Sequence, residues 1–469
     1  MSHPAENPEP YSADQSNDVD AFHSETAHNT IDPSQPNELV SIDDTGEIPT
    51  VTDETPDPPI ASEPVATLVV ETPDAVITEP ECLIESDDVF ERAADPTDPD
   101  LSIKSLTDIV EGYEPGAPVI LGLHEYQYLQ NRRIVIVGGG PVGVWIAWYA
   151  ALHGARVTII DDGLNQTFLV AAGWCFPYHS TDPVAVPWAL TAAKMWEAHT
   201  PFLPTGAVRK ERTRVERTGR AAPFPSMYEQ LEGYRALRGD ELTAGMKSGF
   251  EAQSLVIPAQ IWHPAMRNSL EQLGVVWLNR HIHTALEFED LKVAFNADFV
   301  VDAMGVYSAF VFDDPKFHPL RGTVLDFELP ENYEHGVRSW DLEDGTHRDP
   351  YAVPLRSLNI LRVGGETHPL SQAKAEDLID SGCTPEPEVV DAIYRRAVEF
   401  MPELKDMTYI EAHTGVRPAR DKFLLGFHPE GRSILHASGF GGAGITLAPK
   451  IGHEIVWAMI EASQGWAGC

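Results

Sequence analysis

A glycine-rich turn between two apolar segments is the feature that most constrains how this chain can fold. The segment Arg133-Ile-Val-Ile-Val-Gly-Gly-Gly-Pro-Val-Gly143 is followed, after a further apolar stretch, by Val157-Thr-Ile-Ile-Asp161. Residues 134–137 form an unbroken apolar run, which is typical of a strand buried on both faces of a parallel sheet. The order of strand, glycine turn, helix and strand therefore predicts a Rossmann-type α/β unit that binds a dinucleotide.

The glycines of this turn have separate expected tasks. Gly138 allows the tight turn, and Gly140 lets the backbone approach a pyrophosphate. Gly143 lets the helix predicted at 144–153 pack closely on the sheet. The free N–H groups and the dipole at the start of this helix, next to Pro141 and Val142, favour a bound phosphate.

An acidic residue follows the second predicted strand, where such units bind the adenosine ribose. Asp161 lies about 20 residues beyond the turn, where a carboxylate accepts hydrogen bonds from the ribose hydroxyls, and Asp162 follows it directly. These residues predict a dinucleotide site. The turn alone leaves open whether the dinucleotide is FAD or NAD.

The first hundred residues differ in composition from the rest of the chain. Residues 1–100 contain 26 acidic residues and a single base, Arg92, so they carry most of the net charge of −39. Many prolines and few aromatic residues leave too little apolar surface to offset the entropy of ordering. We therefore predict a disordered acidic tail at 1–100 and an N-terminal extension at 101–130. Such a tail repels nucleic acid and anionic membranes.

Two features of the sequence, its targeting signals and the spacing of its cysteines, indicate the cellular compartment of the protein. The N-terminus shows no basic start followed by an apolar run, so no secretory signal is expected. The apolar stretch at 142–152 is too short to span a membrane. The cysteines have neither a metal-binding nor a disulfide spacing; they are Cys82, Cys175, Cys383 and Cys469. We expect a cytoplasmic protein with no bound metal and no membrane partner.

Two glycine turns, one near each end of the expected folded part, predict one cofactor domain assembled from distant segments. We assign 131–185, 255–315 and 410–465 to this discontinuous Rossmann-type domain. The remaining segments, 186–254 and 316–409, switch to short strands with turns. They are expected to form an inserted, strand-rich α+β domain that binds the substrate.

Shorter signals mark individual segments. Residues 167–178 are expected to be a loop, and the basic, polar residues 207–220 a surface excursion. The pattern of 387–400 predicts an amphipathic helix. The second glycine turn, at 439–446, is expected to lead into a final helix.

Four motifs, taken in order, resemble those of the D-amino-acid oxidase family. Val170-Ala-Ala-Gly-Trp-Cys-Phe-Pro-Tyr178 is similar to its flavin-contacting loop, and Asp344-Gly-Thr-His-Arg-Asp-Pro-Tyr351 to the end of its active-site lid. His413-Thr-Gly-Val-Arg-Pro-Ala-Arg420 is similar to its substrate-arginine motif. Gly441-Gly-Ala-Gly-Ile-Thr446 is similar to its glycine turn at the pyrimidine edge of the flavin. The resemblance covers 131–461 and implies FAD, held without a covalent link.

The resemblance also implies which residues contact FAD. Beyond the first turn and its acids, they are mostly backbone groups of the flavin loop, the middle segment and the second glycine turn: Thr167, Ala171, Ala172, Gly173, Ile282, Gly305, Gly441, Gly444, Ile445 and Thr446. Thr167 is the main candidate phosphate donor, because Phe168 and Leu169 replace polar residues that are usual in the family.

Substrate-binding residues follow from the same motifs. Arg417 is in the place of the family's carboxylate clamp, and a guanidinium fork matches a carboxylate with two hydrogen bonds. Tyr351 corresponds to the lid tyrosine that binds the same carboxylate, and Gly442 to the carbonyl that receives the amine. His347 stands where the family usually has a second lid tyrosine. Together with Arg348 it could favour a substrate with a second carboxylate.

The resemblance implies FAD-dependent oxidative deamination of a D-amino acid to a 2-oxo acid, ammonia and hydrogen peroxide. The expected partners are a small-molecule substrate and oxygen, with a homodimer as one possible assembly. One alternative is a relative that acts on glycine, sarcosine or another specialised amine. Another is a non-catalytic flavin-fold scaffold, against which Arg417 and Tyr351 speak, because a scaffold needs no carboxylate clamp.

Overall fold

The computed structural model describes residues 127–164, 166–177, 185–219, 225–342, 349–429 and 431–465, all within one compact unit. The predicted acidic tail and nearly all of the extension at 101–130 lie outside these ranges, as do His347 and Arg348. The assignment of separate cofactor and substrate domains stays a prediction.

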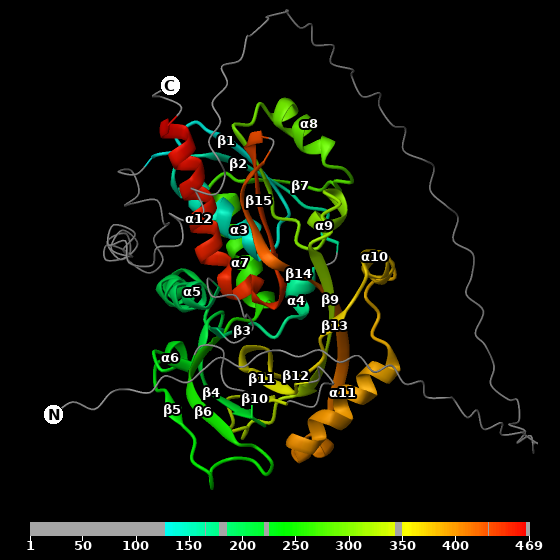
Figure 1. The fold of residues 1–469 in the computed structure, drawn as a ribbon. Helices are drawn as coiled ribbons and strands as arrows, with labels where there is room; N and C mark the ends of the chain where they lie inside the picture. Colours follow the sequence, from blue (N-terminus) through cyan, green and yellow to red (C-terminus); the bar gives the residue numbers. More distant parts are fainter. Residues whose placement is uncertain are drawn as a thin grey trace, which may run out of the picture. The chain divides into compact units, whose positions relative to one another are not determined.

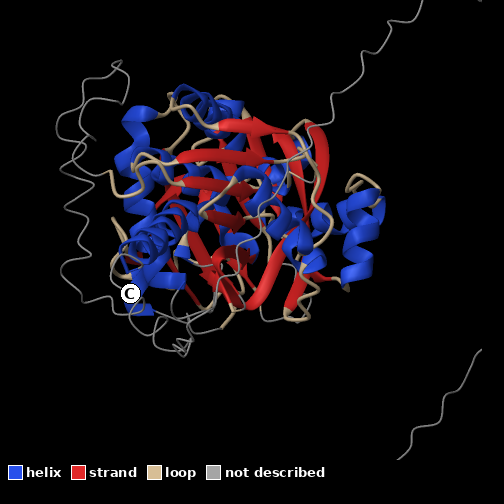
Figure 2. Ribbon diagram, turned by 90° about the horizontal axis from the view of Figure 1, so that it is seen from above, coloured by secondary structure: helices blue, strands red, loops and turns tan. Residues whose placement is uncertain are grey.

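In the described part of the chain, fifteen strands form one mixed sheet, with helices around it (Figures 1 and 2). Five strands at one end are parallel, in the order β15 (Gly431–Phe440), β8 (Phe299–Asp302), β1 (Arg133–Val137), β2 (Arg156–Ile160) and β7 (Val276–Leu278). The apolar side chains of β15, β8, β1 and β2 are buried, as expected for strands covered on both faces, whereas Val276 and Leu278 of the edge strand β7 are exposed. The prediction of an α/β fold is confirmed.

The other end of the sheet is mainly antiparallel, and two long strands connect it to the parallel end. These are β9 (Phe317–Glu328) and β14 (Tyr409–His428); β14 pairs with β9 over its first half and with β15 over its second. The remaining strands are β3 (Trp174–Cys175), β4 (Arg209–Arg217), β5 (Arg235–Ala236), β6 (Ser248–Val256), β10 (Val337–Asp341), β11 (Tyr351–Leu355), β12 (Ile360–Gly364) and β13 (His368–Pro369).

The helices flank this sheet. The α-helices are α3 (Pro141–Leu152), α4 (Thr167–Val170), α5 (Ala185–His199), α6 (Pro225–Tyr228), α7 (Ala259–Gln272), α8 (Leu286–Phe295), α9 (Tyr307–Val311), α10 (Gln372–Asp380), α11 (Pro387–Phe400) and α12 (Gly444–Gly465). Short 3₁₀ turns are η5 (Thr200–Phe202), η6 (Arg356–Leu358), η7 (Pro402–Asp406) and η8 (Gly441–Ala443). None of the described helices is long and apolar enough to cross a membrane.

Most predicted helices and strands are present with shifted ends. Helix α3 begins at Pro141 rather than at residue 144, because proline at the first helical position has the backbone angle that a helix needs. Helix α11 has the predicted bounds, and it buries Ile393 and Ala397 on one face. The predicted loop at 167–178 instead contains α4 and β3 in its described part.

The predicted surface excursion at 207–220 is wrong. Residues Arg209–Arg217 form β4, which pairs with β6 and β10 inside the sheet. Its buried acids have partners from distant segments: Glu211 accepts from Arg356 at 2.8 Å, and Glu216 from the Trp340 indole at 2.9 Å. Hydrogen bonds from these distant residues offset the free-energy cost of burying the two carboxylates. The composition of the segment does not reveal such partners.

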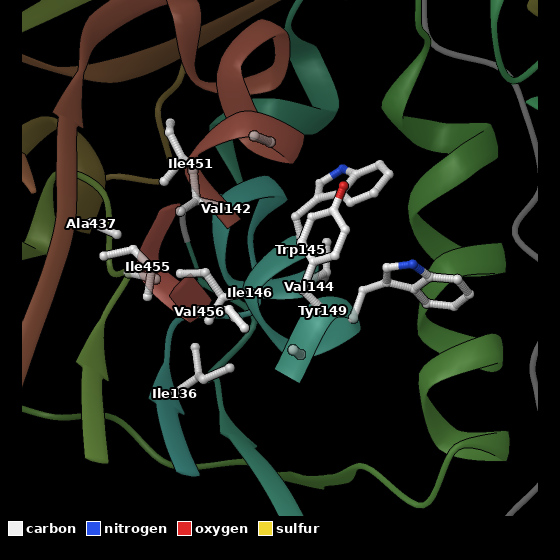
Figure 3. Packing of buried hydrophobic residues seen from close by; sticks show 14 of the residues in the cluster. Ile136, Val142, Val144, Trp145, Ile146, Tyr149, Ala437, Ile451, Ile455 and Val456 are labelled. Atoms are coloured by element: carbon white, nitrogen blue, oxygen red, sulfur yellow. The ribbon is translucent and has the colours of Figure 1, made fainter. Parts of the chain in front are cut away.

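The packing of α3 on α12 brings the two predicted glycine turns to the same site. Trp145 and Ile146 of α3 are buried in the same cluster as Ile451 and Ile455 of α12 (Figure 3). The helices cross closely because Gly452 has no side chain; a Cβ there would lie 2.9 Å from the Trp145 Cβ. The first residues of both helices line one cavity.

Candidate active site

A cavity of about 410 Å³ opens at the carboxyl ends of the parallel strands. Segments that follow β1, β2, β8 and β15 all contribute to its wall, as do β9, β11 and β14 from the antiparallel side. Ligands of open α/β sheets bind at this edge. The fold therefore places one cavity where the sequence motifs predicted a dinucleotide and a substrate.

The glycines of the first turn have different surroundings. Gly138 has φ +108°, and a Cβ there would lie 2.3 Å from the Ala303 carbonyl oxygen. A Cβ on Gly143 would lie 1.9 Å from the carbonyl oxygen of Gly138. At Gly140 the nearest atom, on Phe168, is 3.9 Å away. Gly138 and Gly143 are thus required by packing, whereas Gly140 leaves open space on the cavity.

Asp161 and His263 hold the neighbouring turn residue Gly139. The Asp161 carboxylate lies on the cavity wall, and burial raises its pKa even though backbone hydrogen bonds from Gly139 oppose the shift. Burial lowers the pKa of His263. Its Nε2 lies 2.7 Å from the Gly139 carbonyl oxygen, to which it donates, because a carbonyl oxygen can only accept. Asp162, which also lines the cavity, pairs with His281.

The second glycine turn lines the other part of the cavity. Gly441 has φ +54°, and no heavy atom lies within 4 Å of a Cβ built on Gly442 or Gly444. Ile445 is held from behind, because the Trp196 indole donates to its carbonyl at 3.1 Å. Because these glycines have no side chains, there is room for a planar ring to bind at the N-terminus of α12.

Two glycines support the predicted substrate residues. The Arg417 guanidinium of β14 lies over Gly322 of β9; a Cβ there would lie 2.3 Å from its Nη2. The Tyr351 ring of β11 lies in the same way over Gly364 of β12, with a distance of 2.3 Å. Arg417 Nη1 also donates to Thr367 Oγ1 at 3.3 Å. A side chain at either glycine would displace a residue of the site.

The predicted flavin loop lies between these two regions. Thr167 begins α4 and packs against Gly415, and its hydroxyl donates to the Val416 carbonyl at 3.3 Å. Ala171, Ala172 and Gly173 follow α4 and line the cavity.

Nearly all predicted site residues in the described part of the chain line this one cavity. Those not yet placed, Pro141, Val142, Ile282, Gly305 and Thr446, do so as well. Gly143 does not, since it packs beneath the first turn. His347 lies outside the described residues, so its predicted contact is untested.

Sequence reasoning missed several polar or aromatic residues of the cavity wall. These are Trp174, Arg280, Ser339, Asp349, Glu366 and Thr367. The doublet Gly364-Gly365 directly after an apolar strand was a usable signal, since it marks a close approach of backbone to another group. Trp174 lay within the quoted flavin loop and could have been assigned with it.

A buried ion pair lies behind the flavin loop. Arg362 donates to both carboxylate oxygens of Asp326, from Nε at 2.8 Å and from Nη2 at 2.7 Å. His413 Nε2 lies 3.3 Å from the same carboxylate. Burial raises the pKa of Asp326, but hydrogen bonds from Arg362 and His413 outweigh it, so the pKa is lowered.

The lowered pKa of Asp326 predicts a loss of stability in acid. A carboxyl whose pKa is lower in the folded state stabilises the fold above its unfolded pKa of about 3.9 and loses that contribution as pH falls through the folded value. We expect the melting temperature to fall more steeply below about pH 4 in the wild type than in Asp326→Asn, which cannot titrate. Melting curves across pH test this; equal slopes would mean that Asp326 does not contribute.

Comparisons with known proteins found a family and relatives that match this chain. The model of the family described as FAD dependent oxidoreductase matches residues 133–457. A D-amino-acid oxidase from Streptomyces coelicolor is 29% identical over 326 residues, 68% of this chain and 94% of that protein. Another from Rubrobacter xylanophilus is 26% identical over 72% of this chain and 96% of that protein.

A solved structure shares the fold. The crystal structure of glycine oxidase from Geobacillus kaustophilus superposes with a TM-score of 0.58 at 21% sequence identity. The match covers 71% of this chain and 95% of that chain.

The residues present fit FAD. Gly140 leaves space at the first turn for a pyrophosphate, and Gly442 and Gly444 leave space at the second for the flavin. Asp161 lies on the wall at the end of β2, where a ribose hydroxyl can donate to it. The family whose model matches is described as FAD dependent oxidoreductase, so the question that the first turn left open is answered in favour of FAD.

Proposed function

This chain belongs to the FAD dependent oxidoreductase family, and we propose that it oxidises a D-amino acid to the imino acid, which water hydrolyses to the 2-oxo acid and ammonia, while oxygen is reduced to hydrogen peroxide. The observation that carries the proposal is the position of Arg417 and Tyr351. They come from two different strands, and both line the cavity that contains the two glycine turns.

FAD, when bound, supplies the acceptor for the hydride that leaves the substrate Cα. The chain itself must bind the carboxylate, orient the Cα–H bond and exclude water. Arg417 is suited to bind the carboxylate with two parallel hydrogen bonds, and the Tyr351 hydroxyl to donate a third. Because Gly322 and Gly364 support these side chains from behind, both are held ready before substrate enters.

The substrate amine needs an acceptor of its own. The amine and the carboxylate are attached to the same carbon, so this acceptor must lie near the carboxylate clamp. We assign the task to the Gly442 carbonyl, since Gly442 lines the same cavity next to open space. A neutral amine donates to such a carbonyl while its lone pair assists departure of the hydride. In this proposal no side chain is required as a general base, provided that the amine enters unprotonated.

Anaerobic reduction tests the proposed reaction directly. Purified protein that carries FAD should lose the visible absorption of the oxidised flavin when D-amino acids are added, and should keep it with the L-enantiomers. Reduction by glycine, sarcosine or another N-methyl amine, with no response to D-amino acids, would favour the specialised-amine alternative. A protein that no amine reduces would favour the scaffold. Admission of air to the reduced protein should restore the absorption and yield hydrogen peroxide.

Tyr351→Phe is expected to lower kcat/KM by about 5- to 30-fold. The change removes one hydrogen bond to a charged group, which is worth about 1–2 kcal/mol, and it keeps the ring over Gly364. Steady-state kinetics with the best D-amino acid measure the effect. An unchanged kcat/KM would place the substrate carboxylate away from Tyr351.

A further inference from the structure

The buried pair Arg362–Asp326 makes one contact that a structural ion pair does not need. Side chains of both residues are 2% exposed, and Arg362 is in β12, next to the β9 strand that carries Asp326. Two nitrogens of the guanidinium, Nε and Nη2, donate to Asp326. The third, Nη1, donates to the Ala171 carbonyl at 2.8 Å. Ala171 belongs to the cavity wall, whereas Arg362 lies behind it.

The carbonyls of this loop are held on the side away from the cavity. The Gln260 side chain donates to the Leu169 carbonyl, and the Ile257 N–H donates to the Gly173 carbonyl at 2.8 Å. Gly173 has φ +63°, and a Cβ there would lie 2.3 Å from the Ile257 carbonyl oxygen, so the loop is tightly fitted at this end. Arg362 holds the middle of the loop.

A fixed carbonyl also fixes the N–H that follows it. In a planar trans peptide the carbonyl of one residue and the N–H of the next point in opposite directions. Because the Ala171 carbonyl is drawn toward Arg362, the Ala172 N–H points the other way, and both alanines line the cavity. We propose that Arg362 is a positioning residue that aims the Ala172 N–H at the bound FAD.

Stability alone does not explain a buried arginine at this place. A buried ion pair can often be replaced by apolar residues of similar volume with little loss of stability, because desolvation offsets the attraction. What apolar residues cannot supply is the donor to the Ala171 carbonyl. Lysine cannot supply all three contacts either, since it lacks the planar fork that reaches Asp326 and Ala171 at once.

The test separates positioning from stability with two variants of the full-length protein. Arg362→Met removes the donor but leaves Asp326 buried without its partner, so it is expected to weaken both fold and FAD binding. The double variant Arg362→Met with Asp326→Leu replaces the pair by apolar side chains and is expected to restore the melting temperature of the apoprotein. FAD dissociation constants are measured by flavin fluorescence, together with the absorption spectrum and the midpoint potential of the bound flavin.

We expect the double variant to bind FAD at least about tenfold more weakly than wild type and to show a shifted flavin spectrum and potential, because one oriented donor is lost. Arg338→Met is the matched control: it removes another largely buried arginine, paired with Glu403, that does not line the cavity. This control should leave the flavin spectrum unchanged. Wild-type FAD affinity, spectrum and potential in the double variant would overturn the proposal and leave the pair a purely structural role. None of these measurements depends on the substrate, so the outcome is independent of the proposed reaction.

Discussion

Arg417→Leu is expected to lower kcat/KM for a D-amino acid by about 30- to 5,000-fold. Removal of one partner from a buried, hydrogen-bonded charge pair costs about 2–5 kcal/mol, much of it because the other charge is left unpaired. Here that charge is the substrate carboxylate, which would enter the cavity beside an apolar side chain. Leucine also leaves the space over Gly322 unfilled, so substrate orientation is lost together with affinity.

Two further measurements make this result specific. Arg417→Lys keeps the positive charge but not the fork, so it should recover only part of the loss. FAD content and melting temperature should remain near wild type in both variants, since the Arg417 side chain is only partly buried and, among the described residues, its guanidinium hydrogen-bonds to Thr367. Near-normal kcat/KM in the leucine variant would show that the substrate carboxylate binds elsewhere.

Gly140→Leu is expected to give a folded, colourless protein. A Cβ at Gly140 meets only Phe168, at 3.9 Å, so the protein itself tolerates a side chain there. The added atoms would occupy the space on the cavity that the pyrophosphate needs. Absorption spectra of the purified protein measure flavin content, and circular dichroism with thermal melting measures folding.

Gly143→Ala provides the contrasting control. Its Cβ would lie 1.9 Å from the Gly138 carbonyl oxygen, so α3 must move away from the turn. We expect a lower melting temperature, with a cost of about 1–3 kcal/mol for overpacking, and FAD loss only as a consequence. If Gly140→Leu keeps its flavin, the cofactor does not pass over this turn.

The sequence allowed the cofactor site to be predicted because its parts are local. The strand Arg133–Val137, the turn after it and Asp161 lie within one short segment, and the spacing of glycines reflects backbone requirements that hold in any protein. Arg417 and the turn at Gly441 were likewise found within short motifs. The structure places these separate motifs on one cavity.

Residues whose environment depends on distant partners could not be predicted in this way. Residues Arg209–Arg217 looked like an exposed basic segment, but Glu211 and Glu216 are buried in β4 because Arg356 and Trp340 supply their hydrogen bonds. The sequence shows that a residue is charged. Whether that residue can be buried depends on a hydrogen-bonding partner, which only the tertiary structure supplies.

By itself, the sequence determined an α/β fold with a dinucleotide site, since apolar periodicity and glycine spacing act over a few residues. That the dinucleotide is FAD was implied by the resemblance of short motifs to a known family. Tertiary structure decided how that site is held. Arg362 and Ala171 are 191 residues apart in the chain, yet one hydrogen bond joins them. Such a contact leaves no periodic or local pattern in the sequence. It forms only when the chain folds and β12 comes to lie next to the flavin loop.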